Sequence, residues 1–168
     1  MLTSIFWLAP AASILALFFA WFFYQQMKKK SEGTDRMARI ASYVRKGAMA
    51  YLKQQYKVVI IVFICLIGVL AFLAFGLKVQ NRWVPVAFLT GGFFSGLAGF
   101  FGMKTATYAS ARTANAARQS LDSALKVAFR SGAVMGLTVV GLALLAISLW
   151  FLILKYFYPI GDEHNLII

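Results

Sequence analysis

The sequence predicts an all-α membrane protein with four transmembrane helices, and three observations support this fold class. Of the 168 residues, 61% are hydrophobic and 13% are charged, whereas a soluble domain is nearer half apolar and a quarter charged. Four apolar stretches, at about residues 5–27, 58–77, 83–104 and 131–155, each approach the ~20 residues that a helix needs to cross a bilayer. Alternation with a period of two residues is absent, which argues against a β-barrel.

The positive charge of the chain predicts its orientation in the membrane. A net charge of +12 is compatible with nucleic-acid binding. The positions of the charges instead favour a role in orienting the protein in the membrane. Nine Lys or Arg lie between the first two apolar stretches and five lie between the last two, out of 17 in the chain. The positive-inside rule therefore predicts that residues 28–57 and 104–130 are cytosolic and that both termini are outside. The partner implied is the lipid bilayer, and no nucleic acid is expected.

The first apolar stretch has the character of an anchor that stays in the protein. It lacks a basic segment before it and is followed by Lys28, Lys29 and Lys30. A cleaved signal peptide has the opposite arrangement.

The first basic segment contains an amphipathic helix. Apolar residues recur at helical spacing from Met37 to Leu52, and Arg39, Lys46 and Lys53 form a stripe on another face. This helix either lies on anionic headgroups or forms the cytosolic start of the second span. The second interpretation is favoured because no helix breaker precedes Val58.

The second span is bulky, with Gly68 as its one mid-span glycine, which is typical of a lipid-facing helix. The link of residues 78–82 is short, so the second and third spans form an antiparallel hairpin.

The third span carries a stripe of small residues that continues into the polar sequence after it. Steps of three and four place small residues on one face, a pattern that permits close helix packing. A helix from Val84 to Ala117 is about 50 Å long, so its last third is expected in the cytosol beside an equally long partner. A leucine at Gly99 is then expected to disrupt assembly rather than chemistry. The stripe consists of Gly92, Ser95, Gly99, Gly102, Ala106, Ala109, Thr113 and Ala116.

The fourth span returns after a short link around residues 119–123. Asp122 suits the first turn of this helix because a carboxylate is favourable at the positive end of the helix dipole. Near the end of the chain, Pro159 and Gly161 predict a turn, and residues 165–168 predict the start of another apolar run.

No catalytic or metal-binding residues are expected in this chain. Its five acidic residues all lie outside the spans, and its single histidine, His164, lies in the terminal segment. Ion carriers usually need ionisable groups within the membrane, and magnesium sites need clustered carboxylates. The chain by itself therefore reads as a scaffold.

Two long runs of sequence resemble one family. The run GMKTATYASARTANAAR, from Gly102 to Arg118, and the later run ALKVAFRSGAVMGLTVVGL resemble the third and fourth helices of the membrane-embedded, ion-pumping inorganic pyrophosphatases. One departure is Arg45-Lys46, where the family commonly has an acidic residue before Gly-Ala. The residues that carry the family signature are Arg112, Asn115, Arg118, Arg130, Gly132 and Gly136.

The resemblance implies a homodimeric pump with about sixteen helices per subunit, in the bacterial inner membrane. It would hydrolyse pyrophosphate with Mg²⁺, with K⁺ as a possible activator, and move H⁺ or Na⁺ outward. This chain would be the N-terminal part, belonging to an outer ring of helices, and would be inactive alone because the catalytic motifs come later. The alternative from another class is a stand-alone four-helix scaffold or partner subunit without catalysis.

Overall fold

A computed structural model describes residues 6–157, and four long helices account for most of them. They are α2 (Leu8–Lys28), α3 (Asp35–Ala71), α4 (Val84–Ala117) and α5 (Leu121–Phe157), with a π-helical turn, η1 (Phe72–Gly76), directly after α3. Each helix is long and apolar enough to cross a membrane, so the predicted fold class is confirmed. The turn predicted at Pro159 and Gly161 and the apolar run at 165–168 lie outside the described residues.

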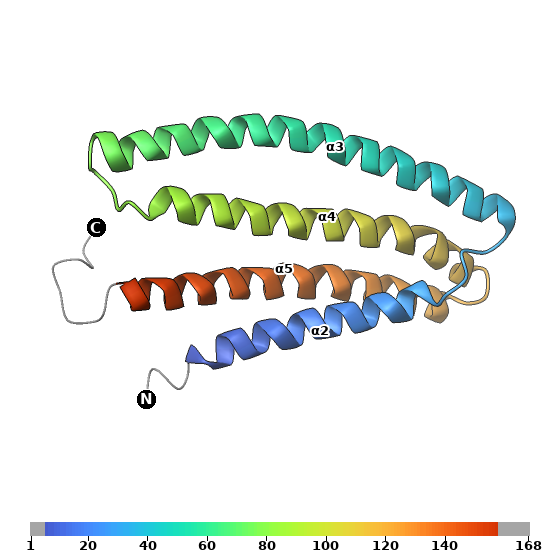
Figure 1. Ribbon diagram of the computed structural model, residues 1–168. Coiled ribbons are helices and arrows are strands. Elements are labelled where there is room, and N and C mark those ends of the chain that lie inside the picture. The colour runs from blue at the N-terminus through green and yellow to red at the C-terminus, as the bar shows by residue number, and fades with distance from the viewer. Residues whose placement is uncertain (1–5, 158–168) are drawn as a thin grey trace.

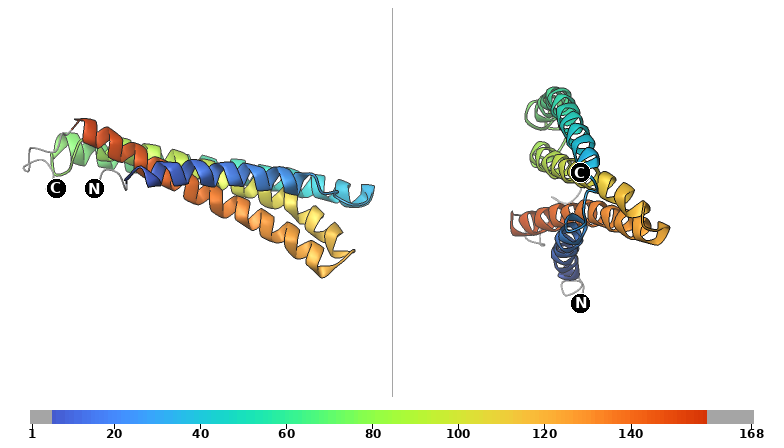
Figure 2. Two further views of the ribbon diagram at one scale, coloured as in Figure 1. Left: turned by 90° about the horizontal axis from the view of Figure 1, so that it is seen from below. Right: turned by 90° about the vertical axis from the view of Figure 1, so that its right-hand side faces the viewer.

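The helices form a row rather than a closed bundle (Figure 1). α3 packs on α4, α4 on α5, and α5 on α2, while α2 touches α4 only slightly. The end-on view in Figure 2 shows the same order, with α3 and α2 at opposite edges. Among the described elements, α3 is therefore attached mainly through α4.

The helices extend beyond the apolar stretches, as the sequence predicts. α3 runs unbroken from the amphipathic segment into the second span, which confirms that this segment is the start of that helix. α4 has the bounds that the spacing predicts, Val84–Ala117, and Pro85 stands in its first turn, where a missing N–H is tolerated. Asp122 lies in the first turn of α5, also as predicted.

The row has two ends that differ in composition. We call the basic end the one where α2 and α4 finish and α3 and α5 begin, and the far end the opposite one. At the basic end, Met27, Ala109 and Val127 form a small apolar core, against which Tyr24 and Tyr108 pack. Most other large apolar side chains, such as those of α3 from Val58 to Phe72, are exposed on the described chain. Such a surface suits lipid or further helices.

Aromatic side chains join the helices towards the far end. The indole Nε1 of Trp150 in α5 donates to Thr90 Oγ1 in α4 at 2.7 Å. The ring of Trp83 lies edge-on to that of Trp150, with centroids 6.3 Å apart. Phe63 of α3 stacks on Phe88 of α4 at 4.5 Å. These contacts hold α3, α4 and α5 together without charged groups.

Candidate functional site

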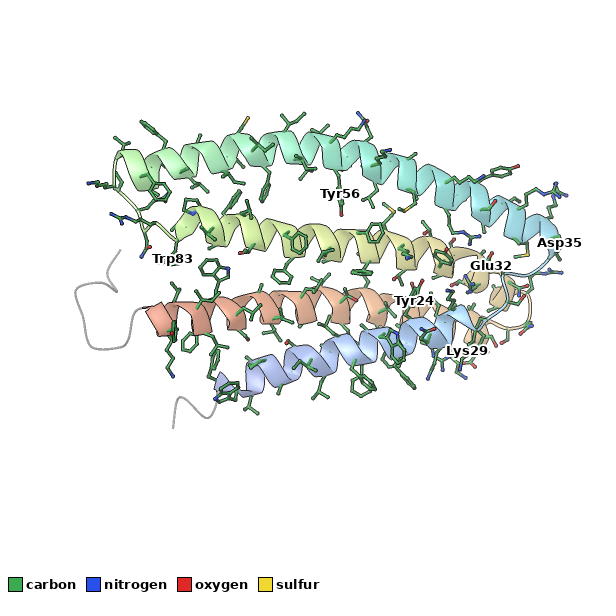
Figure 3. The ribbon with its side chains drawn as sticks, viewed as in Figure 1. Tyr24, Lys29, Glu32, Asp35, Tyr56 and Trp83 are labelled. Carbon is green, nitrogen blue, oxygen red and sulfur yellow. The ribbon has the colours of Figure 1, made fainter. Side chains whose placement is uncertain are left out.

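A connected group of polar side chains lies at the basic end, around the link between α2 and α3. Figure 3 shows Glu32 there, between the ends of α3 and α4, and Trp83 at the opposite end. Side chains from α3 and α4 converge on this link, and we call the group the Glu32 clamp. Its members are Glu32, Arg45, Tyr108, Arg112 and Asn115.

Glu32 joins two helices through its carboxylate. Arg45 of α3 binds it through two nitrogens, with Nη1 at 2.8 Å from Oε1 and Nη2 at 3.2 Å from Oε2. Arg112 of α4 places its Nη1 at 2.9 Å from the same Oε1. Two-nitrogen arginine–carboxylate pairs have defined geometry as well as strength. A single carboxylate therefore fixes the position of α3 relative to α4.

Arg112 is buried, with 7% of its surface exposed, and its charge is compensated by nearby oxygens. Its Nε donates to the carbonyl oxygen of Lys30 at 2.9 Å. Its Nη1 donates to the carbonyl oxygen of Tyr108, one turn earlier in α4, at 2.6 Å. A buried charge is tolerated when it is paired and hydrogen-bonded. Arg112 thus binds both the backbone and the carboxylate of the link.

Tyr108 provides an apolar surface for both guanidinium groups. The Cζ of Arg45 lies 4.8 Å from the centre of the Tyr108 ring, and that of Arg112 lies 5.7 Å away. Arginine over an aromatic face is attracted by the ring quadrupole. The ring therefore orients the two arginines that share Glu32.

The backbone of the link approaches α4 closely at Gly33. Asn115 Nδ2 donates to the carbonyl oxygen of Ser31 at 3.4 Å. Gly33 has a φ of +97°, and a Cβ there would lie 2.7 Å from Met37 Sδ and 2.9 Å from Asn115 Oδ1. Glycine alone combines this backbone conformation with so little space. Thr34 then begins α3, because its Oγ1 accepts from Met37 N at 3.4 Å.

The clamp keeps Glu32 ionised. Partial burial raises the pKa of Glu32, but the hydrogen bonds from Arg45 and the positive charges of Arg112 and Arg45 lower it by more. The pKa of this carboxyl therefore lies below its ordinary value. Since both arginines remain charged at neutral pH, the three-group pairing is intact there.

The clamp is chemically suited to holding helices together. Its carboxylate and carbonyl oxygens already accept hydrogen bonds from arginine and asparagine side chains. Within residues 6–157, no group of three or more His, Cys, Asp or Glu side chains could hold a metal ion.

The residues of the predicted small-residue stripe lie in different environments. Gly102 and Ala109 are buried, and a Cβ on Gly102 would lie 3.1 Å from Met135 Cε of α5. Gly92 instead faces α3, where a Cβ would overlap the Phe63 ring. Thr113 and Ala116 are half-buried, and Ser95, Gly99 and Ala106 are exposed on the described chain. Within the described chain the stripe therefore meets more than one neighbour, and its role as a packing face stays a prediction.

The physical reason is that small residues occur on more than one face of α4. The buried positions from the middle of this helix onward follow the same steps of three and four but share only two members with the stripe. They are Ala98, Gly102, Thr105, Ala109 and Arg112. Because nearly every residue from Thr105 to Ala117 is small or short, spacing alone does not show where to begin counting. A role for the exposed members in packing against further helices stays a prediction.

The six signature residues also have different positions. Arg112 and Asn115 belong to the clamp, and Arg118 is exposed, with its Nη1 at 3.8 Å from Met37 Sδ. Arg130 is half-buried near the start of α5, while Gly132 and Gly136 are exposed with open space around their Cα atoms.

Sequence reasoning does not find Glu32, Arg45, Tyr108 or Gly33 as parts of one site. Glu32 is 13 residues from Arg45 and 82 residues separate Lys30 from Arg112, so no local pattern connects them. One usable signal was present: Glu32 is one of only two acidic residues, with Asp35, in the strongly basic sequence from 28 to 57, which suggests an internal partner.

Four long apolar helices joined by short links, with a charged cluster at one end, define a polytopic α-helical membrane protein. The family model described as "Inorganic H+ pyrophosphatase" matches residues 14–167 of this chain. The chain therefore belongs to the H⁺ pyrophosphatase family.

Curated relatives carry related names. A putative K⁺-stimulated pyrophosphate-energized sodium pump of Bacteroides thetaiotaomicron is 66% identical over 155 residues, which cover 92% of this chain and 21% of that protein. A K⁺-insensitive pyrophosphate-energized proton pump of Methanosarcina mazei is 41% identical over 83% of this chain and 20% of its own length. A K⁺-stimulated sodium pump of Thermotoga maritima is 42% identical over 97% and 22%. The chain thus spans about a fifth of the length of these relatives.

Proposed function

We propose that this chain is the N-terminal part of a membrane pump that hydrolyses pyrophosphate and moves Na⁺ or H⁺ outward. The supporting observation is the family match over residues 14–167, together with relatives that are all named pyrophosphate-energized pumps. Since the chain spans about a fifth of those relatives, the activity belongs to a longer protein.

Between the two ions, we favour Na⁺, with K⁺ as an activator. The 66% identical relative is named a K⁺-stimulated sodium pump, whereas the relative named a K⁺-insensitive proton pump from Methanosarcina mazei is 41% identical. Hydrolysis that requires Na⁺ and rises with K⁺ would support this assignment. A rate of hydrolysis that does not depend on Na⁺ or K⁺ would instead favour a proton pump.

The proposed role of these four helices is to frame the catalytic part. Two features favour this role. Glu32 and Arg112 are engaged with each other and with neighbouring helices, which is a structural use of charge. The row is open and exposes much apolar surface, which suits lipid on one side and further helices on the other. An outer position in a subunit of about sixteen helices, and a homodimer of such subunits, are consistent with that surface.

Magnesium is part of the proposed reaction, but the described residues do not fit a site for it. A magnesium site needs carboxylates that converge with substrate oxygens. In residues 6–157, Glu32 is bound to two arginines and Asp122 to Lys126, and no metal-binding group of side chains forms. We therefore assign no catalytic step to this chain.

The proposed orientation places the basic end in the cytosol, and the proposed location is the bacterial inner membrane. The α3 and α5 segments before the spans, and the end of α4, would then project from the bilayer on the inner side. Both termini would lie outside. Attaching a reporter that is active only in the cytosol to the link at residues 118–120 tests this orientation, and an inactive reporter would reverse it.

Two experiments test the proposal. The coding frame past Ile168 should continue into further hydrophobic segments with Asp-rich motifs; a stop codon there would favour the four-helix scaffold. Membranes that contain the native-length protein should hydrolyse pyrophosphate in the presence of Mg²⁺, and membranes that contain residues 1–168 alone should not. Clear hydrolysis by residues 1–168 would show that the chain itself is catalytic.

A further inference from the structure

A polar cleft opens at the basic end beside the Glu32 clamp. It lies between the α2–α3 link, the last turns of α4 and the first turns of α5, and has a volume of about 250 Å³. We call it the basic cleft. Its lining residues carry side chains that can donate hydrogen bonds: Lys30, Ser31, Arg112, Asn115, Gln119, Ser123, Lys126 and Arg130.

The basic cleft has an excess of positive charge. Lys30, Arg112, Lys126 and Arg130 line it, and none of the lining residues is acidic. Two carboxylates lie near it: Asp122 pairs with Lys126 at 2.6 Å, and Glu32 is shared by Arg112 with Arg45. Four cations against two carboxylates leave the cleft positive, so the ligand that it suits is an anion.

Arg112, a mostly buried residue, also lines the cleft. Its Nε and Nη1 bind the carbonyl oxygens of Lys30 and Tyr108, and Nη1 also pairs with Glu32. Its Nη2 makes no hydrogen bond within residues 6–157 and is not a fully buried atom, although only 7% of the residue is exposed. Guanidinium nitrogens match phosphate oxygens well in geometry and charge. The clamp fixes the guanidinium of Arg112, so its charge is already in place at the cleft before a ligand arrives.

The depth of the basic cleft matches the region of phospholipid headgroups under the proposed orientation. Lys30 lies two residues after the end of α2, and Arg130 directly precedes the apolar part of α5. The apolar core of Met27, Ala109 and Val127 lies beside it, and Val127 also lines the cleft. Basic pockets between transmembrane helices at this depth are typical sites for anionic headgroups.

We propose that the basic cleft binds a phosphate group, carried either by an anionic phospholipid or by free inorganic phosphate. This inference rests on the proposed orientation, which puts the basic end of the helix row in the cytosol. The Glu32 clamp connects the α2–α3 link with α3 and α4. Bound phosphate would also connect this link with the start of α5.

The test uses the native-length protein purified in detergent, with two phosphate probes. In one arm, native mass spectrometry measures binding of phosphatidylglycerol and of phosphatidylcholine. In the other arm, calorimetry measures binding of inorganic phosphate without added lipid. The test variant is the double substitution Lys30→Gln and Arg130→Gln, because neither side chain belongs to the clamp. The control is Lys53→Gln with Lys57→Gln, which removes the same charge from exposed positions of α3.

Phosphate binding by the unmodified protein should weaken about 30-fold in the cleft variant, and less than about 2-fold in the control. That 30-fold change corresponds to ~2 kcal/mol. Preference for phosphatidylglycerol identifies a lipid headgroup as the ligand, and binding of inorganic phosphate alone identifies the free ion. Absence of binding in both arms, or equal loss in the control, would overturn the proposal.

Two further readouts keep the outcome clear. The melting temperature of the cleft variant should equal that of the control, which shows that lost binding is not lost folding. Pyrophosphate hydrolysis measured on the same samples reports the proposed function separately. A protein that binds phosphate in the cleft without any hydrolysis would support the cleft and contradict the pump.

Discussion

The two ends of the helix row are held by different chemistry. At the basic end, Glu32 receives two arginines, and Arg112 also binds the backbone of the link. At the far end, Trp150 binds Thr90 across α4 and α5, and aromatic rings fill the space between helices. The two kinds of contact differ because the two ends are expected to have different surroundings, water at the basic end and lipid towards the far end. Charged groups are tolerable near water, whereas within lipid the packing of apolar side chains and short polar contacts must suffice.

The comparison also explains how α3 is retained at the edge of the row. α3 packs mainly on α4. Towards the far end Phe63 stacks on Phe88, mid-helix Tyr56 donates to the carbonyl oxygen of Gly96, and at the basic end Arg45 binds Glu32. Three types of contact at three levels therefore align one helix, and each can be broken separately.

The largest effect is expected from Arg112→Met. This change leaves Glu32 with Arg45 as its one partner and frees the carbonyl oxygens of Lys30 and Tyr108. Each hydrogen bond that involves a charged group contributes roughly 1.5–3 kcal/mol, so the loss of several together gives the largest change. Thermal unfolding of the native-length protein in detergent measures the loss. Arg118→Met is the matched control, since Arg118 is exposed on the same helix and should cost less than about 0.5 kcal/mol. Equal destabilisation by both changes would show that the contacts of Arg112 in the clamp do not contribute specifically to stability.

A steric change at the α3–α4 contact should come next. The Cβ of Gly92→Ala would overlap the Phe63 ring, and overpacking of this kind costs about 1–3 kcal/mol. Gly91→Ala is the control, because a Cβ there meets nothing within 4 Å. The melting temperatures of the two variants should differ, with Gly92→Ala lower. Equal values would show that Phe63 moves aside freely.

The conformation of the link gives a somewhat smaller effect. Gly33→Ala forces a side chain onto a backbone with φ of +97°, which costs of order 1–2 kcal/mol. In contrast, Gly47→Ala lies within α3 in open space and should stabilise by up to about 1 kcal/mol through helix propensity. Opposite shifts in melting temperature are the expected result, and a stable Gly33→Ala variant would show that the link can rearrange.

The smallest effect is expected from pH. The pKa of Glu32 is lower in the folded protein than its ordinary value of 4.5, so its stabilising contribution is present above that value and is lost as the pH falls through the folded pKa. Melting temperature should therefore fall on acidification below about pH 4.5, and Glu32→Gln should lose less than the unmodified protein over the same range. Identical pH profiles would mean that another carboxylate is responsible.

The fold was predictable from the sequence to a greater extent than the site. Hydropathy identifies each span, and the uninterrupted small residues after Lys104 predict that α4 continues to Ala117. The clamp is different because it depends on distant residues that meet only after the helices have paired. Spacing also does not show that Gly92 and Gly102 face different neighbours, because this depends on how α4 is rotated between α3 and α5.

Arg112 holds the α2–α3 link on α4 through contacts that are independent of the far end. Hydrogen–deuterium exchange of the native-length protein tests it most directly, with Arg112→Met compared with Arg118→Met. Residues 29–34 should exchange faster in Arg112→Met alone, and exchange around Thr90 and Trp150 should stay unchanged. Unchanged exchange of residues 29–34 in Arg112→Met, or equal acceleration at both ends, would contradict it.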